Sequence, residues 1–124
     1  EISLGDTIGI GTPMQAKNIM ESVAEKVPLS NLALHFHDTR GQALANIYAC
    51  LELGVSVIDA SVSGLGGCPY AKGAAGNVAT EEVVYMLHGM GIETGIDLEK
   101  LIETGRFISD AFGRMPQSRV SSAL

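Results

Sequence analysis

The sequence contains no tryptophan, and aromatic residues make up only 5% of its 124 residues. Basic residues are also scarce, because 8 Lys and Arg stand against 14 Asp and Glu, which gives a formal net charge of −6. An acidic chain without a basic run is poorly suited to nucleic acid or an anionic membrane as a partner. No apolar run approaches the ~20 residues that span a bilayer. With 46% hydrophobic residues, the expected class is a globular domain or part of one.

Cysteine is scarce as well, since only Cys50 and Cys68 are present. Two widely spaced cysteines do not make a disulfide framework, so a reducing compartment is expected. Cys50 lies in an apolar helical stretch and is expected to be buried, as most free cysteines are. Cys68 lies between residues 60 and 77, a segment with five of the 15 glycines. There it is either a small buried residue or a thiol that exchanges protons near neutral pH.

Apolar segments that fit strands alternate along the chain with segments that fit helices. Strands are expected at 1–4, at 32–34 running on into 35–38, and at 55–58. Helices are expected from Pro13, after Gly41, from Asn77 or Thr80, and after Asp97. This alternation predicts βαβ units, a parallel sheet and an α/β fold. Residues 116–124 are predicted to be a loose tail behind a body of residues 1–115.

Two parallel architectures fit this order, an open doubly wound sheet and an arc of a (β/α)₈ barrel. Three βα units fall well short of the ~250 residues of a complete barrel. Three parallel strands alone would also leave two bare edges, which natural sheets avoid. The chain is therefore expected to need a further part: an upstream segment, a second chain or a second copy of itself.

Polar side chains follow each expected strand at its carboxyl end, where both parallel architectures bind ligands. His35 and His37 are two residues apart on a strand and should point to the same side. They could share one metal ion or be two histidines with separate hydrogen-bond partners. Asp6 fits a turn, and Asn77 fits a helix cap.

Residues 61–70, SVSGLGGCPY, resemble the signature loop of the hydroxymethylglutaryl-CoA lyase family. Residues 1–9 (EISLGDTIG), 35–46 (HFHDTRGQALAN) and 76–81 (GNVATE) resemble the same family in the same order. The resemblance covers all but about the last ten residues. Its cysteine loop is highly specific, whereas the His-x-His run also occurs in related isopropylmalate and homocitrate synthases. Ser63 stands where the signature usually has alanine.

This resemblance implies that the chain supplies the last three βα units of a (β/α)₈ TIM barrel, together with the terminal helices. It also implies roles for individual residues. The implied residues are the metal ligands His35, His37 and Asn77, the catalytic thiol Cys68, the supporting residues Asp6 and Glu81, and the substrate-covering glycines Gly64, Gly66 and Gly67. The implied metal is Mg²⁺ or Mn²⁺, with Zn²⁺ possible.

The implied activity is metal-dependent cleavage of hydroxymethylglutaryl-CoA to acetyl-CoA and acetoacetate, as in leucine degradation and ketone-body formation. Expected partners are the acyl-CoA substrate, the rest of the barrel and a second copy in a homodimer. Expected locations are the cytoplasm in a bacterium and the mitochondrial matrix in a eukaryote. The family's first strand carries an Arg-Asp pair that is absent here, so the chain alone is expected to be inactive. The alternatives are a related condensing synthase and an inactive barrel fragment.

Overall fold

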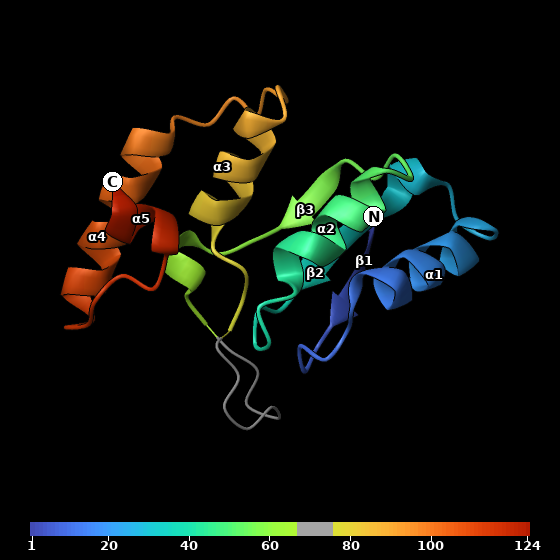
Figure 1. The fold of residues 1–124 in the computed structure, drawn as a ribbon, viewed down its shortest axis with the longest axis horizontal. Coiled ribbons are helices and arrows are strands. Elements are labelled where there is room, and N and C mark those ends of the chain that lie inside the picture. The colour runs from blue at the N-terminus through green and yellow to red at the C-terminus, as the bar shows by residue number, and fades with distance from the viewer. Residues whose placement is uncertain (67–75) are drawn as a thin grey trace. The chain divides into compact units, whose positions relative to one another are not determined.

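The computed structural model of the chain describes residues 1–66 and 76–124 (Figure 1). These residues form two compact units. The first unit contains residues 1–59 together with 76 and 77, and the second contains residues 60–66 and 78–124. Within the described ranges, no helix has the length and apolar character needed to cross a membrane.

The first unit is a three-stranded parallel sheet with two helices. Its strands are β1 (Ile2–Asp6), β2 (Leu32–Phe36) and β3 (Val57–Asp59), in the order β1-β2-β3. Its helices are α1 (Pro13–Ala24) and α2 (Ala43–Leu51), and a short 3₁₀ turn, η1 (Leu29–Asn31), precedes β2. Helices α1 and α2 pack against each other. This is expected of consecutive parallel crossovers of one hand, which place their helices on the same face of the sheet. The predicted alternation of strands and helices is thus observed.

The core of this unit lies between β2 and the two helices. The β2 residues Leu32 and Leu34 have no exposed surface, and neither do Ile47 and Cys50 of α2. Met20 of α1 is 1% exposed. The outer strand β1, by contrast, is largely exposed along its length. The β2 face that carries Leu32 and Leu34 is therefore covered by the helices, whereas β1 is an open edge.

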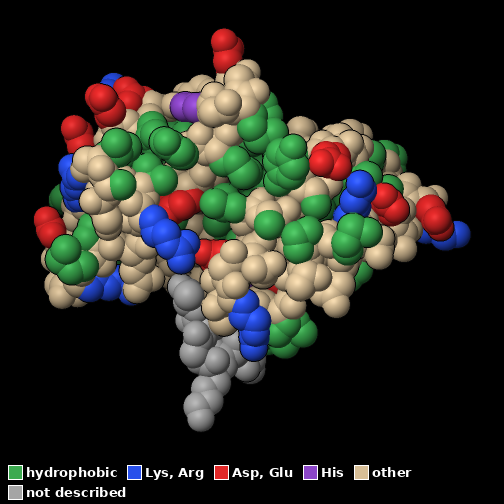
Figure 2. All heavy atoms as spheres, in the orientation of Figure 1, with side chains coloured by type: hydrophobic (Ala, Val, Ile, Leu, Met, Phe, Trp, Pro, Cys, Tyr) green, Lys and Arg blue, Asp and Glu red, His purple; other side chains and the backbone are tan. Residues whose placement is uncertain are grey.

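The second unit is helical. It contains the 3₁₀ turn η2 (Val62–Gly64) and the helices α3 (Thr80–Gly89), α4 (Leu98–Ala111) and α5 (Arg119–Ala123). Val83 and Val84 of α3 and Ile102 of α4 form its apolar core. Hydrophobic side chains also reach the surface (green in Figure 2), and Phe107 of α4 is one of the most exposed of them.

Two sequence predictions differ from this structure. The expected loose tail is wrong for residues 119–123, which form α5, because Ser118 caps this helix and is itself fully buried. The expected cap of α3 is also wrong, because Ala79 is the N-cap residue and Thr80 is already helical. By contrast, Asp97 caps α4 as predicted and accepts a hydrogen bond from the Lys100 amide.

Candidate functional site

The two histidines of the His-x-His run lie side by side. His35 is in β2 and His37 follows its carboxyl end, and their ring centroids are 5.7 Å apart with the ring planes inclined by 47°. This is the arrangement expected of residues i and i+2 of an extended chain. The prediction that both imidazoles point to the same side is confirmed.

His35 is oriented by a carboxylate on the neighbouring strand. The register of the sheet pairs His35 with Asp59, and His35 Nδ1 lies 3.1 Å from Asp59 Oδ2. The same carboxylate accepts a hydrogen bond of 2.9 Å from the Ser3 hydroxyl. A neutral His35 that donates Nδ1–H to Asp59 keeps the lone pair of Nε2 available. This carboxylate–imidazole arrangement commonly orients histidines that bind metal ions.

His37 is joined to the segment that carries Asn77. The two residues form an antiparallel bridge, and the Asp38 amide donates to the Gly76 carbonyl at 3.1 Å. His37 is only 7% exposed, and its Nδ1 is buried with no hydrogen-bond partner among the described residues. A buried ring nitrogen without a partner is costly, so this nitrogen is expected to have a partner beyond the residues described. The structure thus brings together the three residues that the resemblance assigns to the metal.

The residues present fit a divalent cation as an incomplete set of ligands. Among the described residues, no three His, Cys, Asp or Glu side chains come together as a metal site. The set formed by His35, His37 and Asn77 offers two imidazoles and one amide, which suit several divalent cations. A further carboxylate would have to complete it. Metal binding at these residues stays a prediction.

Asp6 binds its own turn. Its Oδ1 accepts from the Ile10 amide at 3.1 Å and its Oδ2 from the Gly11 amide at 2.9 Å. It also lines a half-open hollow of about 460 Å³ beside the buried Asn46, whose Nδ2 donates to the Gly11 carbonyl. The observed contacts are those of a turn residue, and a supporting role for Asp6 near a metal stays a prediction.

Glu81 belongs to the second unit, where it is fully buried in the first turn of α3. Both of its carboxylate oxygens accept from the Ser63 amide, at 3.0 and 2.9 Å. Burial raises the pKa of this carboxyl above its ordinary value, although the Ser63 amide works in the opposite direction. Glu81 therefore holds the turn η2, from which the glycine-rich segment continues. Its predicted place behind the metal ligands stays a prediction.

The residues predicted to cover the substrate are only partly described. Gly64 and Gly66 have φ angles of 66° and 89°, a conformation that glycine adopts without strain. Gly67 and Cys68 lie outside the described residues, so the predicted thiol has no geometry here. Cys50 is buried as predicted, and burial raises its pKa to about 11.

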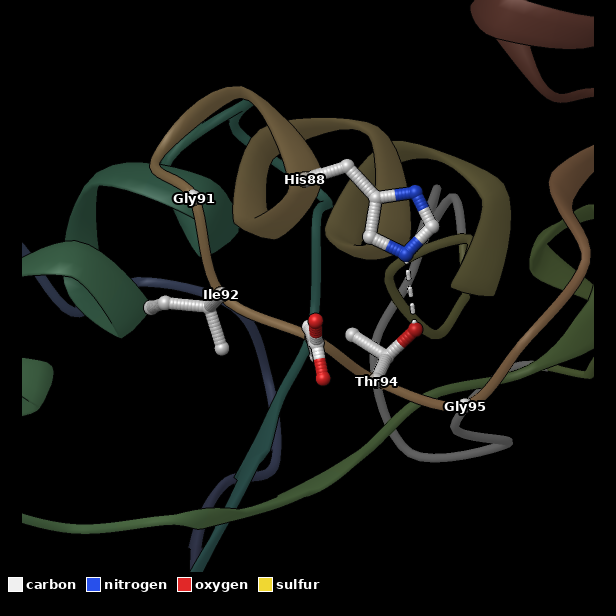
Figure 3. A pocket seen from close by; sticks show the side chains of 6 residues that line it. His88, Gly91, Ile92, Thr94 and Gly95 are labelled. Atoms are coloured by element: carbon white, nitrogen blue, oxygen red, sulfur yellow. Dashed lines mark hydrogen bonds between the residues drawn. The ribbon is translucent and has the colours of Figure 1, made fainter.

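A second hollow of about 430 Å³ lies at the end of α3 (Figure 3). His88 points across it, and its Nε2 lies 2.8 Å from the Thr94 hydroxyl. Thr94 also accepts from the Ile96 amide at 3.2 Å. His88 is exposed, and the contact closes the loop between α3 and α4. We assign it a structural role.

Sequence reasoning did not assign a functional role to Asp59. Asp59 stands at the end of β3, a position where carboxylates commonly bind the amides of a turn. The signal that could have identified it is the pairing of β2 with β3, which aligns Asp59 with His35. A one-residue change of register would have put the carboxylate on the other face. Sequence alone does not fix that register.

Comparison with known proteins places these features in context. The HMGL-like family model matches residues 1–108. The chain is 63% identical over 123 residues to a mitochondrial hydroxymethylglutaryl-CoA lyase of Gallus gallus, covering 99% of this chain and 41% of that protein. It is 58% identical over 123 residues to a cytoplasmic 3-hydroxy-3-methylglutaryl-CoA lyase of Rattus norvegicus, covering 99% of this chain and 36% of that protein.

A solved structure shows the same fold. The hydroxymethylglutaryl-CoA lyase from Pseudomonas aeruginosa matches with a TM-score of 0.96 and 55% identity, over 99% of this chain and 41% of that one. The chain thus spans about two fifths of these relatives. Together with the parallel order β1-β2-β3, the match confirms the predicted βα units of a TIM barrel. The resemblance noted in the sequence is confirmed as well.

Proposed function

Because the chain belongs to the HMGL-like family, we propose that it carries the metal-binding rim of a hydroxymethylglutaryl-CoA lyase. The relatives that bear this name are more than twice as long as the chain. The proposed activity is therefore that of a complete barrel containing this sequence. The reaction is cleavage of hydroxymethylglutaryl-CoA to acetyl-CoA and acetoacetate. The proposed partners are the acyl-CoA substrate, the remaining barrel units and a second copy of the enzyme.

The observation that carries the proposal is the pair of adjacent imidazoles beside Asn77. His37 Nδ1 is buried and lacks a partner among the described residues, although such a nitrogen normally has one. His35 is turned by Asp59 so that its other ring nitrogen can bind a ligand. A rim built only for stability has no need of a buried imidazole that lacks a partner among the described residues and stands next to a second one.

His35, His37 and Asn77 would hold a divalent cation, Mg²⁺ or Mn²⁺, with Zn²⁺ as an alternative. When bound, such a cation acts as a Lewis acid that stabilises the alkoxide of the substrate's tertiary alcohol. The role of Asp59 is to keep the His35 ring in one orientation and to accept its Nδ1 proton in a hydrogen bond. A second carboxylate, from another part of the barrel, would complete the set of ligands.

The reaction breaks the bond between C2 and C3 of the hydroxymethylglutaryl group. The C3 hydroxyl gives its proton to a base supplied by another part of the complete barrel, and C3 becomes the ketone of acetoacetate. The electron pair of the broken bond moves to C2 and into the thioester as an enolate. Cys68 would then donate its thiol proton to C2, which yields acetyl-CoA. The proposal assigns Cys68 from the sequence resemblance, because this residue lies outside the described ranges.

Metal titration tests the proposed ligands directly. In the complete barrel, His37→Ala should weaken Mn²⁺ binding at least about tenfold in titration calorimetry, since one ligand is lost. His88→Ala is the matched control, because His88 is exposed and binds only Thr94 among the contacts described. Unchanged Mn²⁺ affinity in His37→Ala would remove this residue from the set of ligands.

Turnover tests the reaction itself. Cys68→Ser should reduce cleavage of hydroxymethylglutaryl-CoA by about 10²-fold or more while Mn²⁺ still binds, because the hydroxyl is a far weaker acid. The assay should be run with and without a 2-oxo acid. Condensation that requires the 2-oxo acid, with no cleavage of hydroxymethylglutaryl-CoA, would assign the chain to a synthase instead.

The subcellular location depends on the organism. The two relatives described above are mitochondrial in one case and cytoplasmic in the other. We propose the mitochondrial matrix for a eukaryotic source and the cytoplasm for a bacterial one. Fractionation of the source cells, with detection of the protein by antibody, would decide between them.

A further inference from the structure

The turn η2 contains Ser63, whose backbone conformation is unusual. Its φ of 56° lies in the left-handed region, and Ser63 is the only non-glycine residue with positive φ in the ranges described. A side chain with a Cβ atom disfavours this conformation, which persists where the surroundings hold it in place. Ser63 is also only 1% exposed. Its surroundings should therefore show what holds the turn.

The amide of Ser63 is held by the buried Glu81 carboxylate, as described above. Helix α4 packs against Glu81 and Ser63 at Gly105. A Cβ atom on Gly105 would lie 2.5 Å from Glu81 Oε1 and 3.6 Å from the Ser63 Cβ. Glycine at this helix position thus allows α4 to approach the carboxylate and the turn.

The hydroxyl of Ser63 makes a second connection, to the C-terminal segment. Ser63 Oγ accepts from the Gln117 amide at 3.1 Å and lies 3.4 Å from Ser109 Oγ. The next residue, Ser118, is fully buried and donates to Glu82 at 2.9 Å. The turn and the start of α5 are thus tied together through one side chain.

We propose that Ser63 is a positioning residue, whose hydroxyl ties the C-terminal segment to the turn η2, just before the stretch of sequence that carries Cys68. Its amide fixes one side of the turn through Glu81, and its hydroxyl fixes the other through Gln117. An alanine, the residue usual in the family signature, has no acceptor for the Gln117 amide. Without that hydrogen bond the turn loses its contact with Gln117, although Glu81 and the backbone bonds of Ser61 still hold it. Residues 64–66, which lead toward Cys68 in the sequence, then lose part of the support of this turn.

This inference rests on the proposed function only because that function gives Cys68 a chemical role. Thiol labelling tests the positioning role of Ser63 without any measurement of lyase activity. Iodoacetamide labelling of each cysteine is followed by peptide mass spectrometry on the complete protein. Cys50 is an internal control, because it is fully buried and its pKa is raised to about 11, so it reacts only when the protein unfolds.

Ser63→Ala should raise the labelling rate of Cys68 about threefold or more and leave that of Cys50 unchanged, as expected of local opening. It should also speed hydrogen exchange at the Gln117 amide about tenfold, because that amide loses its acceptor. Ser109→Ala is the matched control, since it removes a buried hydroxyl from the same cluster but keeps the Gln117 contact. Its Cys68 should label at nearly the wild-type rate.

Two outcomes overturn the inference. In the first, Cys68 labelling is unchanged in Ser63→Ala. In the second, Cys50 and Cys68 labelling increase together, which indicates a general loss of structure. If Ser63→Ala does not fold, Ser63→Gly decides the question, because glycine accepts φ of 56° without strain and also lacks the hydroxyl. The same selective increase at Cys68 supports the inference, and its absence refutes it. A failed lyase assay would leave this result untouched.

Discussion

Gly105→Ala is the substitution whose effect follows most directly from the structure. In the interior of a helix, alanine is normally more stable than glycine by about 0.5–1 kcal/mol. At position 105, however, the new Cβ would lie 2.5 Å from Glu81 Oε1, whereas ordinary contacts begin near 3.4 Å. Either the carboxylate or helix α4 must therefore move by about 1 Å.

The carboxylate cannot move by that distance and keep its contacts. Its oxygens accept from the Ser63 amide at 3.0 and 2.9 Å, and a hydrogen bond to a charged group contributes about 1.5–3 kcal/mol. Partial loss of this contact, offset by the helix propensity of alanine, gives a net destabilisation of about 1–2 kcal/mol. Urea unfolding followed by circular dichroism measures this difference.

Gly89→Ala is the matched control for this measurement. Gly89 also lies in a helix, but a Cβ atom there would meet nothing within 4 Å. This variant should be neutral or stabilised by up to about 1 kcal/mol. A Gly105→Ala variant that is as stable as the wild type would refute the reasoning. A double variant with Glu81→Ala sharpens the test, because the cost of Gly105→Ala should largely disappear when the carboxylate is absent.

Two further predictions concern the same unit. Burial raises the pKa of Glu81, so the native state keeps this proton at pH values where the unfolded chain has lost it. The stability of the wild type relative to Glu81→Gln should therefore fall as pH rises from about 4.3 through the raised native pKa, and parallel pH dependences in urea unfolding would contradict this. Ser118→Ala should cost about 1 kcal/mol, since Ser118 caps α5 and donates to Glu82. Ser122→Ala, which removes only a bond to the Ser118 carbonyl, should stay within about 0.5 kcal/mol in the same urea assay, and equal effects of the two variants would refute the capping role.

The sequence predicted those parts of the structure that depend on local patterns. Apolar spacing and the residues Pro13 and Asp97 identified α1 and α4, because helix caps are local signals. The spacing of His35 and His37 predicted their shared side, since side chains in a strand alternate. The family resemblance, carried by a few short motifs, predicted the barrel.

Contacts between distant segments could not be predicted in this way. The pairing of His35 with Asp59 depends on the register of the sheet, which no single residue specifies. The helix at residues 119–123 depends on the buried contacts of Ser118, although the composition of this segment is that of a loose tail. Small polar residues are compatible with a loose tail and with a helix, and here the tertiary contacts of Ser118 favour the helix.

Glu81 and Glu82 are consecutive residues at the start of α3, yet they serve different parts of the chain. Successive residues of a helix point about 100° apart, so one carboxylate reaches η2 and the other reaches the cap of α5. A rotation of this first turn about the helix axis would move the Glu81 and Glu82 carboxylates together. The positions of η2 and of the start of α5 therefore depend together on one turn of helix. An insertion between Glu81 and Glu82 would separate the two contacts.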